Sequence, residues 1–198
     1  MPSLTDISET AICNAALIAV GADTIADIGQ ASKVANVLKL RYPMIRDAVL
    51  QAYKWNFAKR RASLPKLDAD PAWGYAYQYL LPADCILVRE LPDATQSIRW
   101  EVEDADDGAV VLTNLAPPLR VLYTTRVQDV SRFRPLFVEA LAARLAADLA
   151  VKLMDNAAAA ERLLGIYQDK LNEARRVDAQ EGSADELPQG DWITERSV

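Results

Sequence analysis

Helical periodicity dominates both ends of the chain. Apolar residues recur every three or four positions over residues 5–20, 31–53 and 133–154, which is the spacing of amphipathic helices. Gly21 is placed to end the first helix. Pro43 should break or kink the second stretch, because proline has no N–H to donate to the preceding turn. A second apolar stripe over residues 160–174, after a capping Asp155 or Asn156, predicts one more helix, so that the last two helices form a hairpin.

The middle of the chain has a different period. Apolar and polar side chains alternate over residues 98–103 and 119–123, and Asp107–Gly108 supplies a short turn before the alternating residues 110–113. Alternation bounded by turn residues is typical of half-buried strands. The sequence therefore predicts a small antiparallel meander in this region.

Together these patterns predict an α+β, mainly α fold: an antiparallel helical bundle with a small antiparallel β-meander insertion and an extended C-terminal arm. We assign residues 1–64 to the N-terminal helices, 65–130 to the β-rich insertion, 131–179 to the C-terminal helical hairpin and 180–198 to the arm. With 51% apolar and 25% charged residues, the composition is that of a globular protein. No apolar run is long enough to predict a membrane span.

The composition removes most catalytic chemistry. The chain has no histidine, which excludes histidine bases and histidine metal ligands. Cys13 and Cys85 are too few for a disulfide framework or an all-cysteine zinc site, and we expect both to be small buried side chains in a reducing compartment. No glycine-rich phosphate loop is present. We therefore expect no enzyme activity, no cofactor and no metal; the acidic run 103–107 is expected to be a solvated hairpin tip rather than a calcium loop.

Charge is distributed in blocks of opposite sign. The formal net charge is −6, yet residues 33–66 hold nine bases against one acid, and residues 67–113 hold ten acids against two bases. Such blocks suit head-to-tail contacts between copies of one chain, although they equally suit neutralisation within one subunit. On this basis the predicted oligomer interface comprises Lys54, Lys59, Arg60, Arg61, Glu101 and Glu103.

Residues 53–61 interleave aromatic and basic side chains. One interpretation is a nucleic-acid surface, because aromatic rings stack on bases while cations meet phosphates. The other is that Trp55 and Phe57 pack into the core where a helix ends, with Lys59, Arg60 and Arg61 near the negative end of that helix. We favour the second, because a net-acidic chain repels a polyanion.

Several stretches, taken in order, resemble a known protein family. They are Ala11-Ile12-Cys13-Asn14-Ala15-Ala16-Leu17, then Gly21, then Tyr42 with Arg46-Asp47-Ala48-Val49-Leu50, then Trp55-Asn56-Phe57-Ala58, Tyr79-Leu80-Leu81-Pro82-Ala83-Asp84 followed by Arg89, and residues 133–154. The chain resembles the tail tubular protein A family of tailed bacteriophages over about residues 6–177, with the W-x-F-A and Y-x-L-P-x-D elements carrying most of the likeness. Members of this family are head-to-tail adaptors that lie beneath the portal.

The resemblance implies a structural role. It implies a ring of twelve copies that joins the portal protein to the tail nozzle protein in the virion neck and is assembled in the host cytoplasm. DNA would pass through the channel without specific binding, and no membrane is involved. Leu187, Trp192 and Ile193 in the polar arm would then dock on the portal or on a neighbouring subunit. The alternative is a nucleic-acid-binding phage accessory protein that uses residues 53–61.

Overall fold

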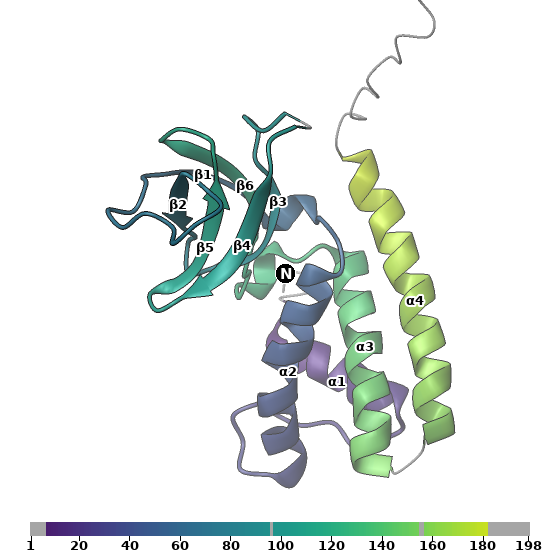
Figure 1. Ribbon diagram of the computed structural model, residues 1–198. Coiled ribbons are helices and arrows are strands. Elements are labelled where there is room, and N and C mark those ends of the chain that lie inside the picture. The colour runs from purple at the N-terminus through teal and green to yellow at the C-terminus, as the bar shows by residue number, and fades with distance from the viewer. Residues whose placement is uncertain (1–6, 96, 155–156, 182–198) are drawn as a thin grey trace, which may run out of the picture.

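The structure, a computed structural model, describes residues 7–95, 97–154 and 157–181. It contains four helices and two three-stranded antiparallel sheets over these residues, with 46% of the chain helical and 21% in strands (Figure 1). The expectation of a mainly helical bundle with one small β-meander is therefore wrong. The sheets form a second layer of structure with its own core, rather than an appendage to a bundle.

The helices lie at the two ends of the chain, as their periodicity predicts. Hydroxyl side chains cap the first two: Ser8 Oγ accepts from the Ala11 N–H and Ser32 Oγ from the Ala35 N–H, each at 3.1 Å. The α-helices are α1 (Glu9–Ala19), α2 (Lys33–Gln51), α3 (Pro135–Met154) and α4 (Ala157–Gln180). Two short 3-10 helices, η1 (Asn56–Ala58) and η2 (Val130–Arg132), precede β1 and α3.

Pro43 does not break α2, which runs unbroken on both sides of it. The expected break is therefore absent. Buried side chains occupy the same helix before and after the proline, namely Leu38, Tyr42, Ile45 and Val49. Burial of these side chains holds the helix together at a position where local preference alone would end it.

The six strands pair mostly with partners distant in sequence. One sheet has the order β1-β6-β3, built from Lys59–Leu64, Leu119–Thr125 and Cys85–Glu90. The other has the order β2-β5-β4, built from Tyr77–Leu80, Gly108–Thr113 and Trp100–Ala105. Only the β4–β5 hairpin joins consecutive strands in the way a meander requires. The predicted turn at Asp107–Gly108 lies in this hairpin, where Ala105 pairs with Gly108 and Gly108 has a φ of 130°.

Strand β1 is the element that the sequence patterns miss. Lys59, Arg60 and Arg61 form its first half rather than lying at a helix end, so that expectation is wrong. The three bases are exposed because β1 is an edge strand, paired only with β6 among the described residues. An edge strand tolerates successive charges, and such a strand shows no alternation of apolar and polar residues.

Two hydrophobic cores divide the described residues. The helical unit, residues 7–58 and 127–181, is built around α1–α4 and buries Trp55, Phe137 and Leu141. The β unit, residues 59–126, buries Tyr79 and Val111 from one sheet against side chains of the other. Figure 1 shows the β unit at one end of the helical unit. None of the helices in the described ranges has the length and apolar character needed to cross a bilayer.

Candidate functional site

The connection from α2 to β1, residues 52–57, is held by hydrogen bonds to its backbone from three directions. We call this segment the linker. From the β unit, buried Arg89 on β3 donates to the Lys54 carbonyl at 3.0 Å and to the Trp55 carbonyl at 2.6 Å. Its Nε donates to Thr124 Oγ1 on β6 at 2.8 Å. One guanidinium therefore ties both of these strands to the linker.

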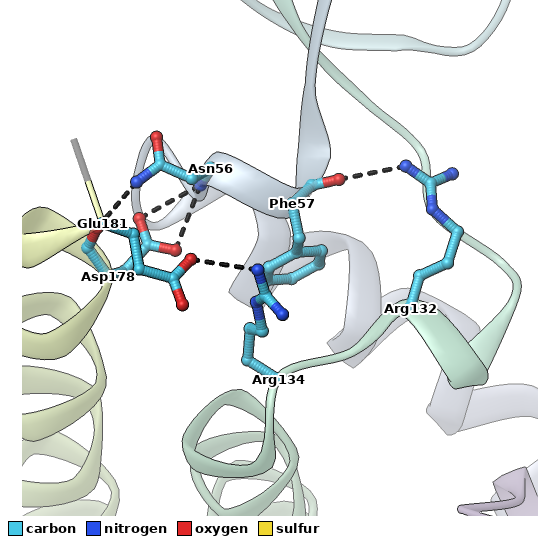
Figure 2. Close-up of polar contacts among 6 residues, drawn as sticks. All are labelled: Asn56, Phe57, Arg132, Arg134, Asp178 and Glu181. Atoms are coloured by element: carbon cyan, nitrogen blue, oxygen red, sulfur yellow. Dashed lines mark hydrogen bonds and ion pairs between the residues drawn. The ribbon is translucent and has the colours of Figure 1, made fainter.

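The last turns of α4 hold the linker from a second side. Both carboxylate oxygens of Asp178 accept from the Asn56 backbone N–H, at 3.1 and 3.0 Å. The Asn56 side-chain amide donates back to the Asp178 carbonyl at 2.6 Å (Figure 2). One turn earlier, Arg175 donates to the Ala52 carbonyl at 2.6 Å, and its guanidinium lies over the Tyr53 ring.

The segment that leads into α3 supplies the third contact. Arg132 donates to the Phe57 carbonyl at 3.0 Å, and Arg134 pairs with Glu181 at 3.1 Å (Figure 2). The linker carbonyls that accept hydrogen bonds from arginine are those of Ala52, Lys54, Trp55 and Phe57. We call the linker together with Arg89, Arg132, Arg175 and Asp178 the joint.

The chain returns from the β unit to the helical unit next to Arg126, and this crossing is also held. Asp84 accepts from Thr125 Oγ1 at 2.5 Å, and its carbonyl accepts from the Arg126 N–H at 2.7 Å. The Arg126 side chain donates to Asp47 on α2 at 2.8 Å. Both connections between the units are therefore bound on each side, which fixes the orientation of one unit relative to the other.

Aromatic packing fills the joint beneath these hydrogen bonds. Trp55 is 1% exposed and donates its indole N–H to the Val49 carbonyl at 2.9 Å. Its ring meets Phe137 edge-on at 5.2 Å between centroids, and Phe57 meets the same Phe137 at 4.9 Å. The interpretation that Trp55 and Phe57 pack into the core is confirmed. Neither ring is free to stack on a base.

Burial shifts the ionisation of the joint's charged groups. Desolvation raises the pKa of Asp178 and lowers that of Arg89, although the attraction between their charges opposes both shifts. Burial also raises the pKa of the Cys13 thiol to about 12 and that of Cys85, which is only half-buried, to about 11. Within the described ranges, no group of three or more potential ligand residues could hold a metal ion.

The structure does not bring the six predicted interface residues together. Lys59, Arg60 and Arg61 lie on edge strand β1, whereas Glu101 and Glu103 lie on β4, the edge of the other sheet. Lys54 is exposed on the linker, and the other five are exposed as well. Arg60 lies 3.8 Å from Asp84 of the same chain, but no ion pair among the described residues joins the predicted bases to Glu101 or Glu103. Leu187, Trp192 and Ile193 lie outside the described residues.

Sequence reasoning missed Asp178 and Trp73. The apolar stripe of α4 runs through Leu163, Tyr167, Leu171 and Ala174, and Asp178 occupies its next position. The sequence could have revealed Asp178, because a carboxyl group at a position of the buried apolar stripe needs hydrogen-bond donors within the fold. Trp73 is 85% exposed in the connection between β1 and β2, and its signal was a tryptophan between Pro71 and Gly74, outside any periodic stretch.

Comparison with known proteins adds no relative. No model of a protein family matches the chain, and no curated protein matches it either.

Proposed function

We propose that this protein is the subunit of a bacteriophage head-to-tail adaptor, a ring of twelve copies that joins the portal to the tail and lets DNA pass. One observation carries the proposal. Two of the stretches that resemble the tail tubular protein A family, residues 55–58 and 133–154, are far apart in the sequence, yet they meet at the joint together with Arg89. Trp55-Asn56-Phe57-Ala58 forms the linker and η1, Arg89 binds its carbonyls, and Phe133 and Phe137 pack on Phe57.

The stretch at residues 79–84 serves the other crossing, where the chain returns to the helical unit at Arg126. Residues 79–84 end in Asp84, whose carboxylate and carbonyl hold Thr125 and Arg126 where the chain leaves the β unit. These parts of the likeness therefore have a common task, which is to fix the β unit against the helical unit. A subunit that transmits force between two large assemblies needs such a joint, since a hinge there would let the portal and the tail move independently.

The proposal includes no catalytic step. The groups with shifted pKa in the joint, Asp178 and Arg89, are engaged with backbone atoms that hold the two units together. The partners are further copies of this chain, the portal protein and the tail nozzle protein, and the location is the virion neck after assembly in the host cytoplasm. DNA in the channel meets a subunit of net charge −6, which opposes adhesion to the wall.

Electron microscopy of the purified protein, alone and mixed with the portal protein of the same phage, tests this function. We expect rings of twelve copies, stacked on the portal when it is present. Particles that remain monomers or dimers in both samples would contradict the proposal. A joint variant such as Arg89→Met should reduce ring formation, because it removes hydrogen bonds between the two units. The control Arg99→Met, at an exposed arginine outside the joint, should leave ring formation unchanged.

Of the features that the nucleic-acid alternative requires in residues 53–61, only the basic side chains are fully available at the surface. Lys54, Lys59, Arg60 and Arg61 are exposed, but the rings of Trp55 and Phe57 are packed against Phe137. Single-strand binding draws much of its energy from base stacking on aromatic rings, and the segment offers little of it.

A further inference from the structure

An exposed tryptophan stands on the outer side of the second sheet. Trp73 is 85% exposed in the connection between β1 and β2, and it lines a hollow together with residues of β2, β4 and β5. Trp73, Tyr75, Glu101 and Glu103 line one shallow hollow with Leu112 at its base. We call this surface, Trp73 with Glu101 and Glu103, the acidic face. It combines a large aromatic side chain with two exposed carboxylates, and tryptophan is among the commonest side chains at the energetic centre of an interface.

A surface of opposite charge lies on the first sheet. A hollow of about 410 Å³ opens there, and we call it the basic hollow; it is lined by Arg61, Ala62, Ser63, Pro92, Arg120 and Val121. Its floor is largely apolar, and two arginines stand at its rim. Arg120 pairs with Asp93, whereas no ion pair within the described part of the chain engages Arg61.

We propose that the acidic face of one copy docks on the basic hollow of the next, with Trp73 seated in the hollow and Glu101 and Glu103 facing Arg61. This inference rests on the proposed function, because the contact would join neighbouring subunits of the proposed ring. A contact between two different surfaces of the same chain is heterologous, and repeating it around a closing rotation produces a ring.

The occupant is a second copy because the two surfaces complement each other in charge and in shape. Carboxylates on one side meet an arginine that has no ion pair with any described residue of its own chain, and an exposed aromatic ring meets an apolar hollow. Within one chain the two surfaces do not meet: Trp73 remains exposed and lines a separate hollow from Arg61. Like charges would repel in the reverse arrangement of two acidic faces or two basic hollows, which favours head-to-tail association.

Disulfide trapping tests this contact. In a Cys85→Ala background, the double variant Ala72→Cys/Ser63→Cys keeps Trp73 and places one cysteine beside each surface. It should give a ladder of covalent dimers, trimers and higher multiples when concentrated protein is oxidised. Each variant with only one of the two introduced cysteines can give at most a dimer, because the remaining Cys13 is fully buried. The ladder is specific to a head-to-tail contact, because a two-fold contact stops at the dimer.

Charge reversal gives an independent measurement on the full chain. Glu101→Lys/Glu103→Lys and Arg61→Glu should each weaken self-association at least about tenfold by light scattering, and combining them should restore it. Trp73→Ala should weaken association by at least about tenfold as well. Leu40→Ala, which truncates a 71% exposed side chain on α2, should leave association unchanged.

The outcomes separate this contact from the adaptor function. Wild-type rings without a ladder, or with unchanged association in the Trp73 and charge variants, would overturn the contact and leave the adaptor standing. A wild-type protein that forms no ring alone or on the portal, and no ladder, would overturn both. A ladder together with restoration in the combined variant would support the contact whatever the ring binds.

Discussion

At the scale of single residues, the joint depends on buried charges that bind backbone atoms. Arg89 and Asp178 reach the linker from opposite units, and their hydrogen bonds end on neighbouring peptide groups between Lys54 and Asn56. Buried hydrogen bonds to charged groups are among the stronger ones in proteins, and removing one partner leaves the other without compensation. The joint is therefore sensitive to small changes at either residue.

Asp178 should make the stability of the protein depend on pH in an unusual direction. Burial raises its pKa in the folded state above the unfolded value of about 3.9. The folded chain therefore binds this proton more tightly, so the stabilisation is present below about pH 4 and is lost as the pH rises through the folded pKa. In Asp178→Asn, which cannot ionise, the free energy of unfolding relative to wild type should rise between about pH 3.5 and pH 7.

Urea unfolding at these two pH values measures the difference. Asp169→Asn, at an exposed position of the same helix, is the matched control and should show no such rise. A difference between wild type and Asp178→Asn that falls as the pH rises would mean that the carboxylate is favoured in the folded state, and a constant difference would mean that folding does not shift its pKa. Either result would contradict the prediction.

At the scale of elements, packing overrides local preference at Pro43. Helix α2 continues through Pro43, which cannot donate to the carbonyl four residues earlier, at Lys39.

Pro43→Ala should therefore raise the free energy of unfolding, by up to about 3 kcal/mol if the helix is otherwise unchanged. Thermal and urea unfolding measure the gain, and Met44→Ala, at a 61% exposed neighbour, should change it by less than about 0.5 kcal/mol. A destabilised Pro43→Ala would show that the proline contributes packing that outweighs the missing hydrogen bond.

What the sequence could predict follows the range of the interactions involved. The helices α3 and α4 and the β4–β5 hairpin carry their own periodicity or turn residues, and each appears where expected. Strand β1 is defined by its pairing with β6. Ala62, for example, pairs with Val121, which lies some sixty positions away in the sequence. Periodicity within a short window carries no information about such a partner.

The same limit applies to the joint and to the exposed surfaces. Trp55 could be assigned to the core from its neighbours in sequence, because it follows an apolar helix face. The contacts of Arg89 and Asp178 with the linker could not, since they depend on how two units approach each other. The 85% exposure of Trp73 also depends on how distant segments are arranged around it, so the neighbouring residues in the sequence could not predict it.

At the scale of the whole molecule, two units of different architecture are joined through paired connections, and the surface charge is negative on balance. With a net charge of −6 and with the rings of Trp55 and Phe57 packed against Phe137, the protein should show no measurable affinity for single- or double-stranded DNA at physiological salt. Fluorescence anisotropy with labelled oligonucleotides measures this. Binding that weakens steeply with added salt, and that Arg61→Glu reduces, would instead favour the nucleic-acid alternative.

The hydrogen bonds between α4 and the linker also constrain the order in which the protein can be completed. Asn56 and Asp178 are separated by 122 positions, and Ala52 and Arg175 by 123. Contacts of such long sequence separation form only after a large loop has closed. During synthesis the β unit leaves the ribosome long before α4 does. The contacts of Arg89 and Arg126 can form at that stage, whereas those of Arg175 and Asp178 must wait for α4. A chain that lacks α4 therefore keeps only part of the joint, and its two units should be less firmly oriented than those of a chain that contains this helix.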